Sequence, residues 1–223
     1  MTPNTGEPSY EKLSLIHRAR SKTQADIWLV AIHPGEKAVL RDYSGEKHFL
    51  MRQLCRWALK REVHVHRLLE GVRGIPKLVA VLDRDRYLIE WIDGQPLSSF
   101  KKVQMPAPFF SDLENVMAEM HSRGVAHGDL RNRNIMVTSE GRPMVIDFST
   151  AWWRTPLWRR PIFQFFKRLD DRRLAKSKQK FCPETLNEME EKILESDPWY
   201  HRVGSIYRHW IYPKVKGREE KRN

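Results

Sequence analysis

Residues 127–147 read HGDLRNRNIMVTSEGRPMVID, and this stretch decides which fold the chain adopts. NIMV has the composition of a strand, SEGRP supplies glycine and proline for a turn, and MVIDF reads as a second strand that ends on the acid. Such a hairpin returns Asp147 to the neighbourhood of Asp129 and Asn134. The stretch therefore predicts two carboxylates and one carboxamide at a single place. A capped hairpin without chemistry is the alternative interpretation.

These three groups suit phosphoryl transfer, which needs a positioned hydroxyl and Mg²⁺ held against the phosphates of ATP. His127, Asp129 and Asn134 fit the pattern H-x-D-x-x-x-x-N, and the tripeptide DFS follows at 147–149. In these residues the chain resembles the protein-kinase-like superfamily, whose catalytic loop precedes a short hairpin that ends in D-F-G.

The resemblance implies a role for each side chain of the loop. Asp129 would accept or orient the proton of the substrate hydroxyl, while Asn134 and Asp147 would bind Mg²⁺. Arg131 falls where protein-serine kinases place a lysine that neutralises the transferring phosphate. For His127 we expect packing and hydrogen bonds within the loop, because Asp129 already serves as the base.

Three apolar runs near the N-terminus predict an antiparallel sheet. They are LSLI at 13–16, IWLVAI at 27–32 and KAVLR at 37–41. In the family, glycines between the first two strands let backbone N–H groups approach the phosphates. Here that loop reads RARSKTQAD and contains no glycine, so either the side chains of Ser21, Lys22 and Thr23 cover the phosphates or this cover is absent.

Arg41 stands where the third strand of the family carries a lysine that grips the α- and β-phosphates. A guanidinium can also bind phosphate, as a planar fork and not as a compact point charge. Lys22 ranks second for this role and Lys37 third. Glu62 follows Arg41 by 21 residues, near the family interval between that lysine and its glutamate partner in a long helix. The alternative interpretation is that Arg41 is an exposed arginine on an edge strand and Glu62 a solvated glutamate on a helix face.

The apolar spacing from about residue 46 to 69 predicts that helix, as one element or two adjoining ones. Two further strands are expected at 78–82 and 87–92. GIP before the first and E-x-x-x-G after the second resemble the aminoglycoside-phosphotransferase, RIO and lipopolysaccharide-kinase branches. Under this resemblance, Glu90 to Ile92 form a hinge whose main chain hydrogen-bonds adenine.

Apolar residues recur at helical intervals over 108–123, and Gly124 ends the pattern as a C-cap does. Ser149 replaces the glycine of D-F-G, which removes backbone freedom and disfavours a mobile switch. The sequence after Phe148 has no A-P-E motif and comprises about 75 residues, too few for the full helical lobe of a protein-serine/threonine kinase. These features favour the compact bacterial lipopolysaccharide-kinase and RIO-like branches.

Residues 152–168, WWRTPLWRRPIFQFFKR, hold six aromatic and five basic side chains. Over 152–180 there are ten basic and two acidic residues. This composition is typical of a helix that lies at the surface of an acidic membrane, although aromatic packing inside a helical lobe explains it equally well. Nucleic-acid binding is a third, weaker reading, because no known nucleic-acid motif accompanies the charge.

The whole chain has 40 basic and 28 acidic residues, a formal charge of +12 that favours an anionic partner. Cys55 and Cys182 are too few for a disulfide framework and suit a reducing compartment. The start of the chain lacks the pattern of a secretory signal, and no apolar run approaches the roughly 20 residues of a membrane span. We therefore expect a cytoplasmic protein, with peripheral contact at the inner membrane as an extension.

The predicted fold is α+β: a bilobal, protein-kinase-like domain with a small antiparallel-sheet N-lobe and a shortened, mainly helical C-lobe. One domain would span 1–223, with the N-lobe at about 10–92, the hinge at 90–96, the C-lobe at 97–215 and a frayed tail at 216–223. Two more helices are expected, one capped near 182–184 and one over about 198–210.

The predicted function is ATP- and Mg²⁺-dependent phosphorylation of a hydroxyl. The favoured acceptor is a membrane-proximal glycan or lipid, such as a lipopolysaccharide core sugar, because of the short C-lobe and the basic aromatic segment. A RIO-like protein serine/threonine kinase is one alternative. A pseudokinase scaffold is the other, since the loop glycines and the strand lysine are missing, although Asp129, Asn134 and Asp147 are all present.

Overall fold

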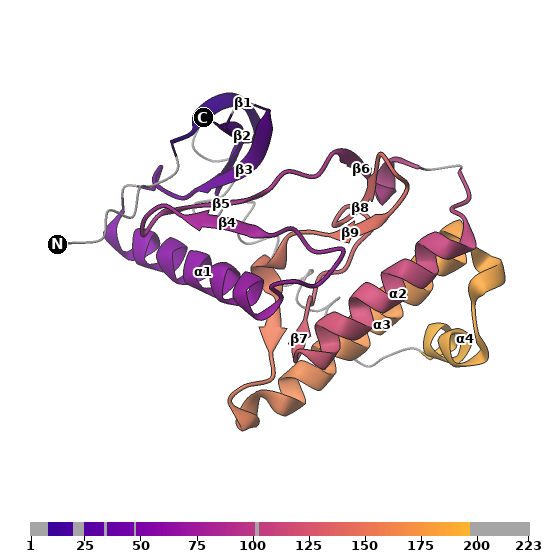
Figure 1. Ribbon diagram of the computed structural model, residues 1–223. Helices are drawn as coiled ribbons and strands as arrows, with labels where there is room; N and C mark the ends of the chain where they lie inside the picture. Colours follow the sequence, from indigo (N-terminus) through magenta and orange to yellow (C-terminus); the bar gives the residue numbers. More distant parts are fainter. Residues whose placement is uncertain (1–8, 20–24, 34, 47, 101–102, 197–223) are drawn as a thin grey trace, which may run out of the picture.

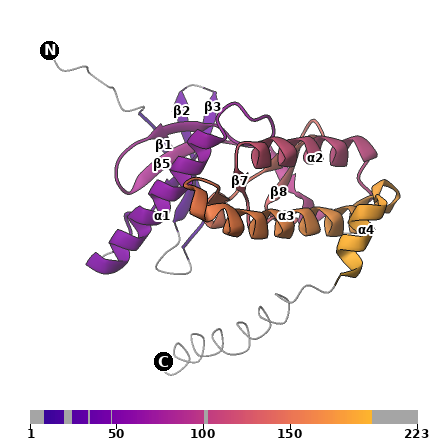
Figure 2. The same ribbon diagram turned by 90° about the horizontal axis from the view of Figure 1, so that it is seen from below.

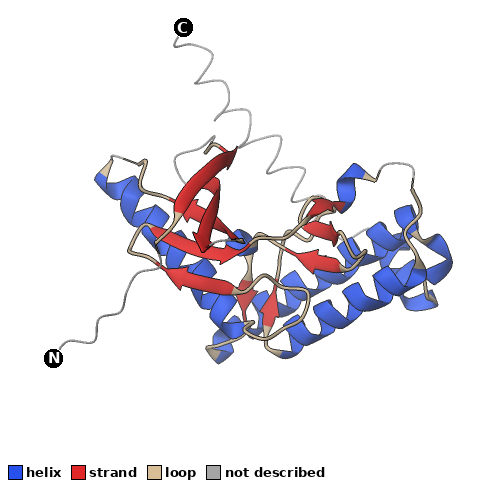
Figure 3. Cartoon of the chain, turned by 45° about the horizontal axis from the view of Figure 1, so that its top comes forward, coloured by secondary structure: helices blue, strands red, loops and turns tan. Residues whose placement is uncertain are grey.

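The computed structural model describes residues 9–19, 25–33, 35–46, 48–100 and 103–196. An antiparallel sheet with one long helix forms the N-terminal part, and two long helices dominate the C-terminal part (Figure 1). Figure 3 shows the same division between strands and the two C-terminal helices. The architecture is α+β, as predicted. The exact bounds of lobes and hinge stay a prediction, and the tail at 216–223 lies outside the described residues.

The N-terminal sheet has five strands in the order β1-β2-β3-β5-β4, and all its pairs are antiparallel. The strands are β1 (Glu11–His17), β2 (Asp26–His33), β3 (Glu36–Asp42), β4 (Leu78–Val81) and β5 (Arg86–Glu90). Ala38 and Leu40 alternate along β3 and are fully buried, as is Leu88 opposite Leu40 on β5. All five predicted strands are present, but β5 ends two residues early.

Helix α1 (Phe49–Leu68) is a single element that lies against this sheet (Figure 1). Its inner face buries Cys55, Leu59 and Val63 in one apolar cluster with Tyr43 and Tyr87 of the sheet region. These positions recur every four residues, which places them on one side of the helix. The opposite side of α1 is therefore left to face solvent.

The segment quoted first forms the predicted hairpin. Strand β8 (Ile135–Thr138) pairs with β9 (Pro143–Val145), and β6 (Gly94–Pro96) pairs with β8 on its other side. A Cβ atom on Gly94 would collide with the carbonyl oxygen of Val137, so β6 approaches β8 closely because it carries a glycine there.

Strand β9 ends two residues before Asp147, whereas the sequence predicts a strand up to the acid. Asp147 adopts φ 68 and ψ 75, the left-handed region, which no strand residue can occupy. The chain then enters the short helix η2 (Phe148–Thr150) and the strand β10 (Trp152–Trp153), which pairs with β7 (Val125–Ala126). This turn re-aims the side chain of Asp147 away from the line of the hairpin.

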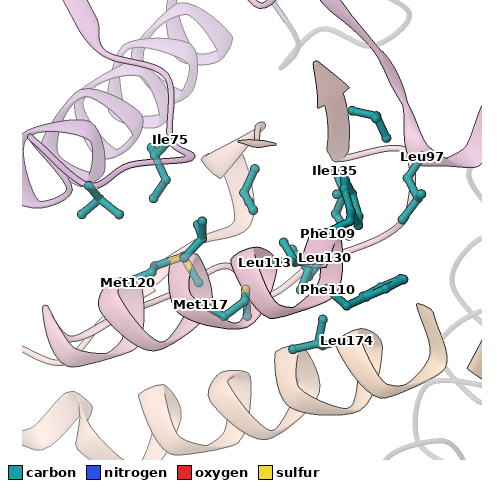
Figure 4. Close-up of a cluster of buried hydrophobic side chains, with 14 of the residues drawn as sticks. Ile75, Leu97, Phe109, Phe110, Leu113, Met117, Met120, Leu130, Ile135 and Leu174 are labelled. Atoms are coloured by element: carbon teal, nitrogen blue, oxygen red, sulfur yellow. The ribbon is translucent and has the colours of Figure 1, made fainter. Parts of the chain in front are cut away.

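The C-terminal part contains α2 (Ala107–Ser122), α3 (Arg160–Phe181) and α4 (Glu188–Glu195). The short helices η1 (Leu97–Ser99), η3 (Leu157–Arg159) and η4 (Pro183–Thr185) connect them. Helix α2 lies alongside α3 and, as predicted, is followed by Gly124, at φ 78 (Figure 2). Phe110, Leu113 and Met120 of α2 are fully buried in the largest core, which they share with Leu130 of the loop at 127–134 and with the β8–β9 hairpin (Figure 4).

The helix predicted to begin near 182–184 starts later. Asn187 and Glu190 form a capping box, in which each side chain bonds the backbone of the other residue, and α4 begins at Glu188. The local capping chemistry thus fixes the start of α4. The further helix expected at 198–210 lies outside the described residues.

Segment 152–180 is divided between β10, η3 and α3. Phe163 is buried, and the half-buried Trp152 stacks on the half-buried Phe166 with ring centroids 5.4 Å apart, so part of the aromatic content packs against the protein itself. Trp158 is different, because 68% of it is exposed. Across the described part of the chain, no helix combines the length and the apolar character that a membrane crossing would need.

Candidate active site

Arg41 on β3 holds together two elements of the site. Its Nη1 donates to both carboxylate oxygens of Glu62 on α1, at 3.0 and 3.1 Å, and its Nη2 lies 3.3 Å from Oδ1 of Asp147. The side chain of Arg41 is 12% exposed and that of Glu62 is 2% exposed. Burial by itself lowers the pKa of Arg41, but the facing carboxylates raise it well above its ordinary value.

Two tyrosines complete the surroundings of Glu62. The hydroxyl of Tyr87 on β5 donates a short hydrogen bond to Oε2 of Glu62, and Tyr43 donates to the same oxygen at 3.4 Å. Burial, followed by the charge of Glu62, raises the pKa of both phenols, so they remain donors. Every polar contact of this buried carboxylate is therefore made by Arg41 or a tyrosine within the described chain.

Asp147 has a strained backbone conformation, and its side chain is held in place by interactions with neighbouring residues. A non-glycine residue in the left-handed region costs free energy and persists only where the surroundings enforce it. Burial would raise the pKa of its carboxyl, but Arg41 and a hydrogen bond from Ser149 outweigh that effect and hold the pKa below its ordinary value. Asp147 is thus an anion near neutral pH, and about a third of its side chain (36%) is exposed.

Helix α1 also contacts the segment after Asp147. His66 meets the ring of Phe148 edge-on at 5.4 Å, and its Nδ1 bonds the carbonyl oxygen of Pro76 at 3.2 Å. Burial, helped by the positive charge of Arg41, lowers the pKa of His66 to about 4. The imidazole is therefore neutral at pH 7, and Nδ1 is the donor to Pro76.

His127 organises the loop at 127–134 from a fully buried position. Its Nδ1 accepts from the backbone N–H of Asp129 at 3.2 Å, so the ring proton lies on Nε2, which bonds the carbonyl oxygen of Ile146 at 2.9 Å. One imidazole thereby joins the loop to the residue before Asp147, in agreement with the structural role expected for it.

Asp170 of α3 supports the same loop and was missed by the sequence analysis. Its carboxylate is fully buried and accepts from the backbone N–H groups of His127 and Gly128, at 2.7 and 2.8 Å. Asp170 and Asp171 are the two acids in the basic stretch 152–180. Two adjacent acids in an otherwise basic stretch indicate a buried or paired carboxylate, but the sequence could not show which of the two faces the loop.

The end of the loop brings Asn134 next to Asp129. The Nδ2 group of Asn134 donates to the backbone oxygen of Asp129 at 2.9 Å, and the backbone oxygen of Asn134 accepts from Ile146 at 2.9 Å. Asn134 is 5% exposed, and its Oδ1 makes no hydrogen bond to the described part of the chain. This oxygen and the carboxylate of Asp147 are ligands of the kind that Mg²⁺ prefers, so the residues present fit the ion.

Asp129 has its own cationic neighbours. Arg131 Nε lies 2.5 Å from one carboxylate oxygen, and Arg133 Nη2 lies 3.1 Å from the other. The two arginine side chains are 52% and 59% exposed. Arg131 therefore lies beside the carboxylate that the resemblance implies is the base, with its guanidinium open to solvent.

Other residues expected at the site are placed as follows. Glu90 exchanges hydrogen bonds with Lys77 through its backbone and its carboxylate, and Ile92 is buried with a main-chain N–H that bonds nothing in the described chain. Both line a groove of about 1360 Å³ between the end of α1, α2 and the β8–β9 turn. Lys37 is exposed at the far end of β3, and Lys22 lies outside the described residues.

Three features together define the protein-kinase-like fold. They are a five-stranded antiparallel sheet with one helix, a helical second part, and a hairpin that returns Asp147 to the loop at 127–134. The family described as RIO1, the RIO domain, matches residues 36–159, more than half of the 223-residue chain. The chain belongs to this family.

Curated relatives agree with this membership. The serine/threonine-protein kinase rio2 of Schizosaccharomyces pombe is 26% identical over 144 residues, which cover 56% of this chain and 41% of that protein. The rio2 kinase of Dictyostelium discoideum is 25% identical over 145 residues, 56% of this chain and 27% of that protein. The chain thus matches less than half the length of either relative.

Solved structures show the same fold. The Rio2 kinase from Chaetomium thermophilum superposes with a TM-score of 0.60 at 19% identity, covering 83% of this chain and 64% of that one. Its ADP/Mg²⁺-phosphoaspartate complex gives a TM-score of 0.59 at 21% identity, over 82% of this chain and 61% of that one. The predicted fold class is confirmed. The RIO branch of the resemblance is supported, and the lipopolysaccharide-kinase branch is not.

Proposed function

We propose that this chain is an ATP- and Mg²⁺-dependent protein kinase of RIO type. The observation that carries the proposal is the bridge from Arg41 to Glu62 and Asp147. A phosphate-binding cation held by a buried helix carboxylate and turned toward a metal-binding aspartate is the arrangement that phosphoryl transfer from ATP requires. In addition, Nε of Arg41 is buried without a hydrogen-bond partner in the described chain, and a phosphate oxygen could accept from it.

Each side chain then has a defined task. Asp129 orients the acceptor hydroxyl and receives its proton, and Arg131, whose guanidinium is exposed beside it, compensates the charge of the transferring phosphoryl group. Asn134 Oδ1 and the carboxylate of Asp147 hold Mg²⁺, which when bound neutralises the phosphates. Arg41 binds the α- and β-phosphates while Glu62 fixes its direction.

Adenine binding is proposed for the main chain between Glu90 and Ile92. The N–H of Ile92 is free of partners in the described chain, so it can donate to a purine ring nitrogen. Lys22 keeps its proposed role as a second phosphate-binding cation from the β1–β2 loop, outside the described residues.

The acceptor is proposed to be a serine or threonine of a protein. The matched curated relatives are named as serine/threonine-protein kinases, and the family is the RIO domain. The glycan or lipid acceptor favoured by the sequence analysis has no support from these comparisons. A scaffold without turnover is disfavoured, because a scaffold does not need Arg41, Asn134 and Asp147 ordered around one place.

Labelled ATP with Mg²⁺ tests the proposal, with protein extracts and lipopolysaccharide core acceptors in separate reactions. We expect label on protein, and its loss in Asp147→Ala. Glu188→Ala, which removes an exposed carboxylate of α4, is the control and should retain turnover. Label found solely on the glycan would contradict the proposal that the acceptor is a protein. Nucleotide binding that does not depend on Mg²⁺, without turnover, would favour a pseudokinase scaffold.

A further inference from the structure

The outer face of α1 carries large apolar side chains in solvent. Leu50 is 76% exposed, Leu54 is 51% exposed and Trp57 is 57% exposed. Their spacing of four and three residues puts them in one row along the helix, opposite the buried Leu59 and Val63. Single exposed apolar residues are normal in proteins, but a continuous row along one helix marks a surface that contacts something else.

Arg61 continues this row by one turn and meets a second arginine. The Arg61 guanidinium lies 4.6 Å from the ring centre of Trp57 and 5.7 Å from that of Trp153. Arg159 of η3 lies 4.2 Å from the ring centre of Trp153 and 5.4 Å from that of Trp158. Two cations from distant parts of the sequence are thus brought to the same group of indoles.

Neither arginine forms an ion pair within the described part of the chain, although the charge of Glu62 partly offsets the lowering of the pKa of Arg61. Arg61 donates to the carbonyl oxygen of Ala151 at 2.8 Å, and the Nε atoms of Arg61 and Arg159 are both buried without a hydrogen bond. Burial, then the positive charge of Arg159, lowers the pKa of Arg61. The two guanidinium groups therefore repel each other, and a negatively charged group placed between them would relieve that cost.

We propose that this surface binds a membrane that contains acidic phospholipids. The lipid-docking surface comprises Leu50, Leu54, Trp57, Arg61, Trp158 and Arg159. The arginines bind lipid phosphates, while the leucine and tryptophan side chains enter the boundary between headgroups and acyl chains. The proposed kinase activity is not needed for this binding.

The positive charge of the molecule favours an acidic membrane over a second copy of this chain as the partner of the lipid-docking surface. The chain carries a net +12, and the stretch 152–180 that supplies Trp158 and Arg159 has ten basic and two acidic residues. An acidic bilayer attracts such a surface, at about 1 kcal/mol for each basic residue near the headgroups. A second copy of this chain would bring the same cations face to face, which opposes self-association through this surface.

Vesicle flotation of the full chain tests the proposal, with phosphatidylcholine vesicles either alone or mixed with phosphatidylglycerol. We expect flotation with the mixed vesicles and none with the neutral ones. Arg159→Gln should reduce binding by about fivefold, and Trp57→Ser should also reduce it, because its ring no longer enters the headgroup boundary. Met189→Ser, which removes an exposed apolar side chain of α4, and Arg73→Gln, which removes an exposed charge, are matched controls and should bind as the parent chain does.

Three results would overturn the proposal: no flotation, equal losses in Arg159→Gln and Arg73→Gln, or unchanged flotation of Trp57→Ser. The second would mean diffuse attraction by total charge, and the third would mean that the apolar row does not enter the lipid. Sedimentation in solution identifies another occupant: a dimer that Trp57→Ser dissociates, without flotation of the parent chain, would assign the surface to a second copy.

Discussion

Nη1 and Nη2 of Arg41 point to different carboxylates: Nη1 lies 3.0 Å from Oε1 of Glu62, and Nη2 lies 3.3 Å from Oδ1 of Asp147. The planar fork of a guanidinium allows one side chain to do both, since its donors are fixed in direction. An ammonium group on a lysine also has three donors, but it presents them from a single nitrogen and not from two nitrogens in a fixed plane. The departure from the family lysine is therefore compatible with an ordered site.

Arg41→Lys tests whether the fork matters. The substitution keeps the charge but replaces the two nitrogens that contact Glu62 and Asp147 by one, which weakens charge-assisted hydrogen bonds worth about 1.5–3 kcal/mol each. We expect kcat/KM for ATP to fall by about tenfold to a hundredfold in a phosphorylation assay. Arg84→Lys, an exposed position in the β4–β5 turn, is the control and should behave as the parent chain. Full activity of Arg41→Lys would show that charge alone suffices.

Tyr87→Phe tests the support of Glu62. Tyr87 is fully buried and donates to the carboxylate of Glu62, whose side chain is 2% exposed, so removal of the hydroxyl leaves one oxygen with fewer donors. We expect the free energy of unfolding in urea to fall by about 1.5–3 kcal/mol. Tyr43→Phe is the matched comparison, because its hydroxyl lies 3.4 Å from the same oxygen, and it should cost less. Equal losses would contradict this ranking.

The sequence predicted most of the elements because its patterns are local. Each pattern predicts a structure from a few neighbouring residues. Examples are the alternating apolar residues in β3, the helical period of 108–123, and the turn residues between β8 and β9. The errors in the predicted elements lie at the residues where strands and helices begin or end. β9 stops before Asp147 because a left-handed backbone is needed there, and no local pattern specifies it.

The candidate site was predictable where a family spacing exists and not elsewhere. Arg41 and Glu62 were paired from an interval of 21 residues, and the structure places them in contact. Asp170 and Tyr87 were missed, since their roles depend on which buried atom they face after the chain has folded. Contacts between residues far apart in the sequence leave no local signature in a single chain.

His66 makes the stability of the fold depend on pH. Its pKa is about 4 in the folded chain and 6.5 ordinarily, so between these values the unfolded chain binds the extra proton and the folded chain does not. Stability that is present above pH 6.5 is therefore lost as the pH falls toward 4. Denaturant titrations should give a free energy of unfolding about 2 kcal/mol lower at pH 5 than at pH 7 from this group.

The variant His66→Gln removes the titrating group and should flatten that dependence. His48→Gln, at an exposed histidine before α1, should leave it unchanged. A pH dependence that persists in His66→Gln would mean that other groups cause it.

Asp170→Ala tests the support of the catalytic loop from α3. The buried carboxylate accepts two backbone N–H groups, and without it the amides of His127 and Gly128 lose their partner inside the protein. An unsatisfied buried donor costs about 1–3 kcal/mol, so we expect a stability loss of a few kcal/mol. The loop would also lose its fixed position relative to Asp147, and kcat should fall more than KM rises. Asp171→Ala is the control, because both aspartates lie near His121, at 3.3 and 3.9 Å, but Asp171 is 35% exposed, pairs with Lys167 and is bonded to no backbone N–H of the loop among the described residues. A similar effect of both substitutions would show that the charge of α3 matters and not the hydrogen bonds to the loop.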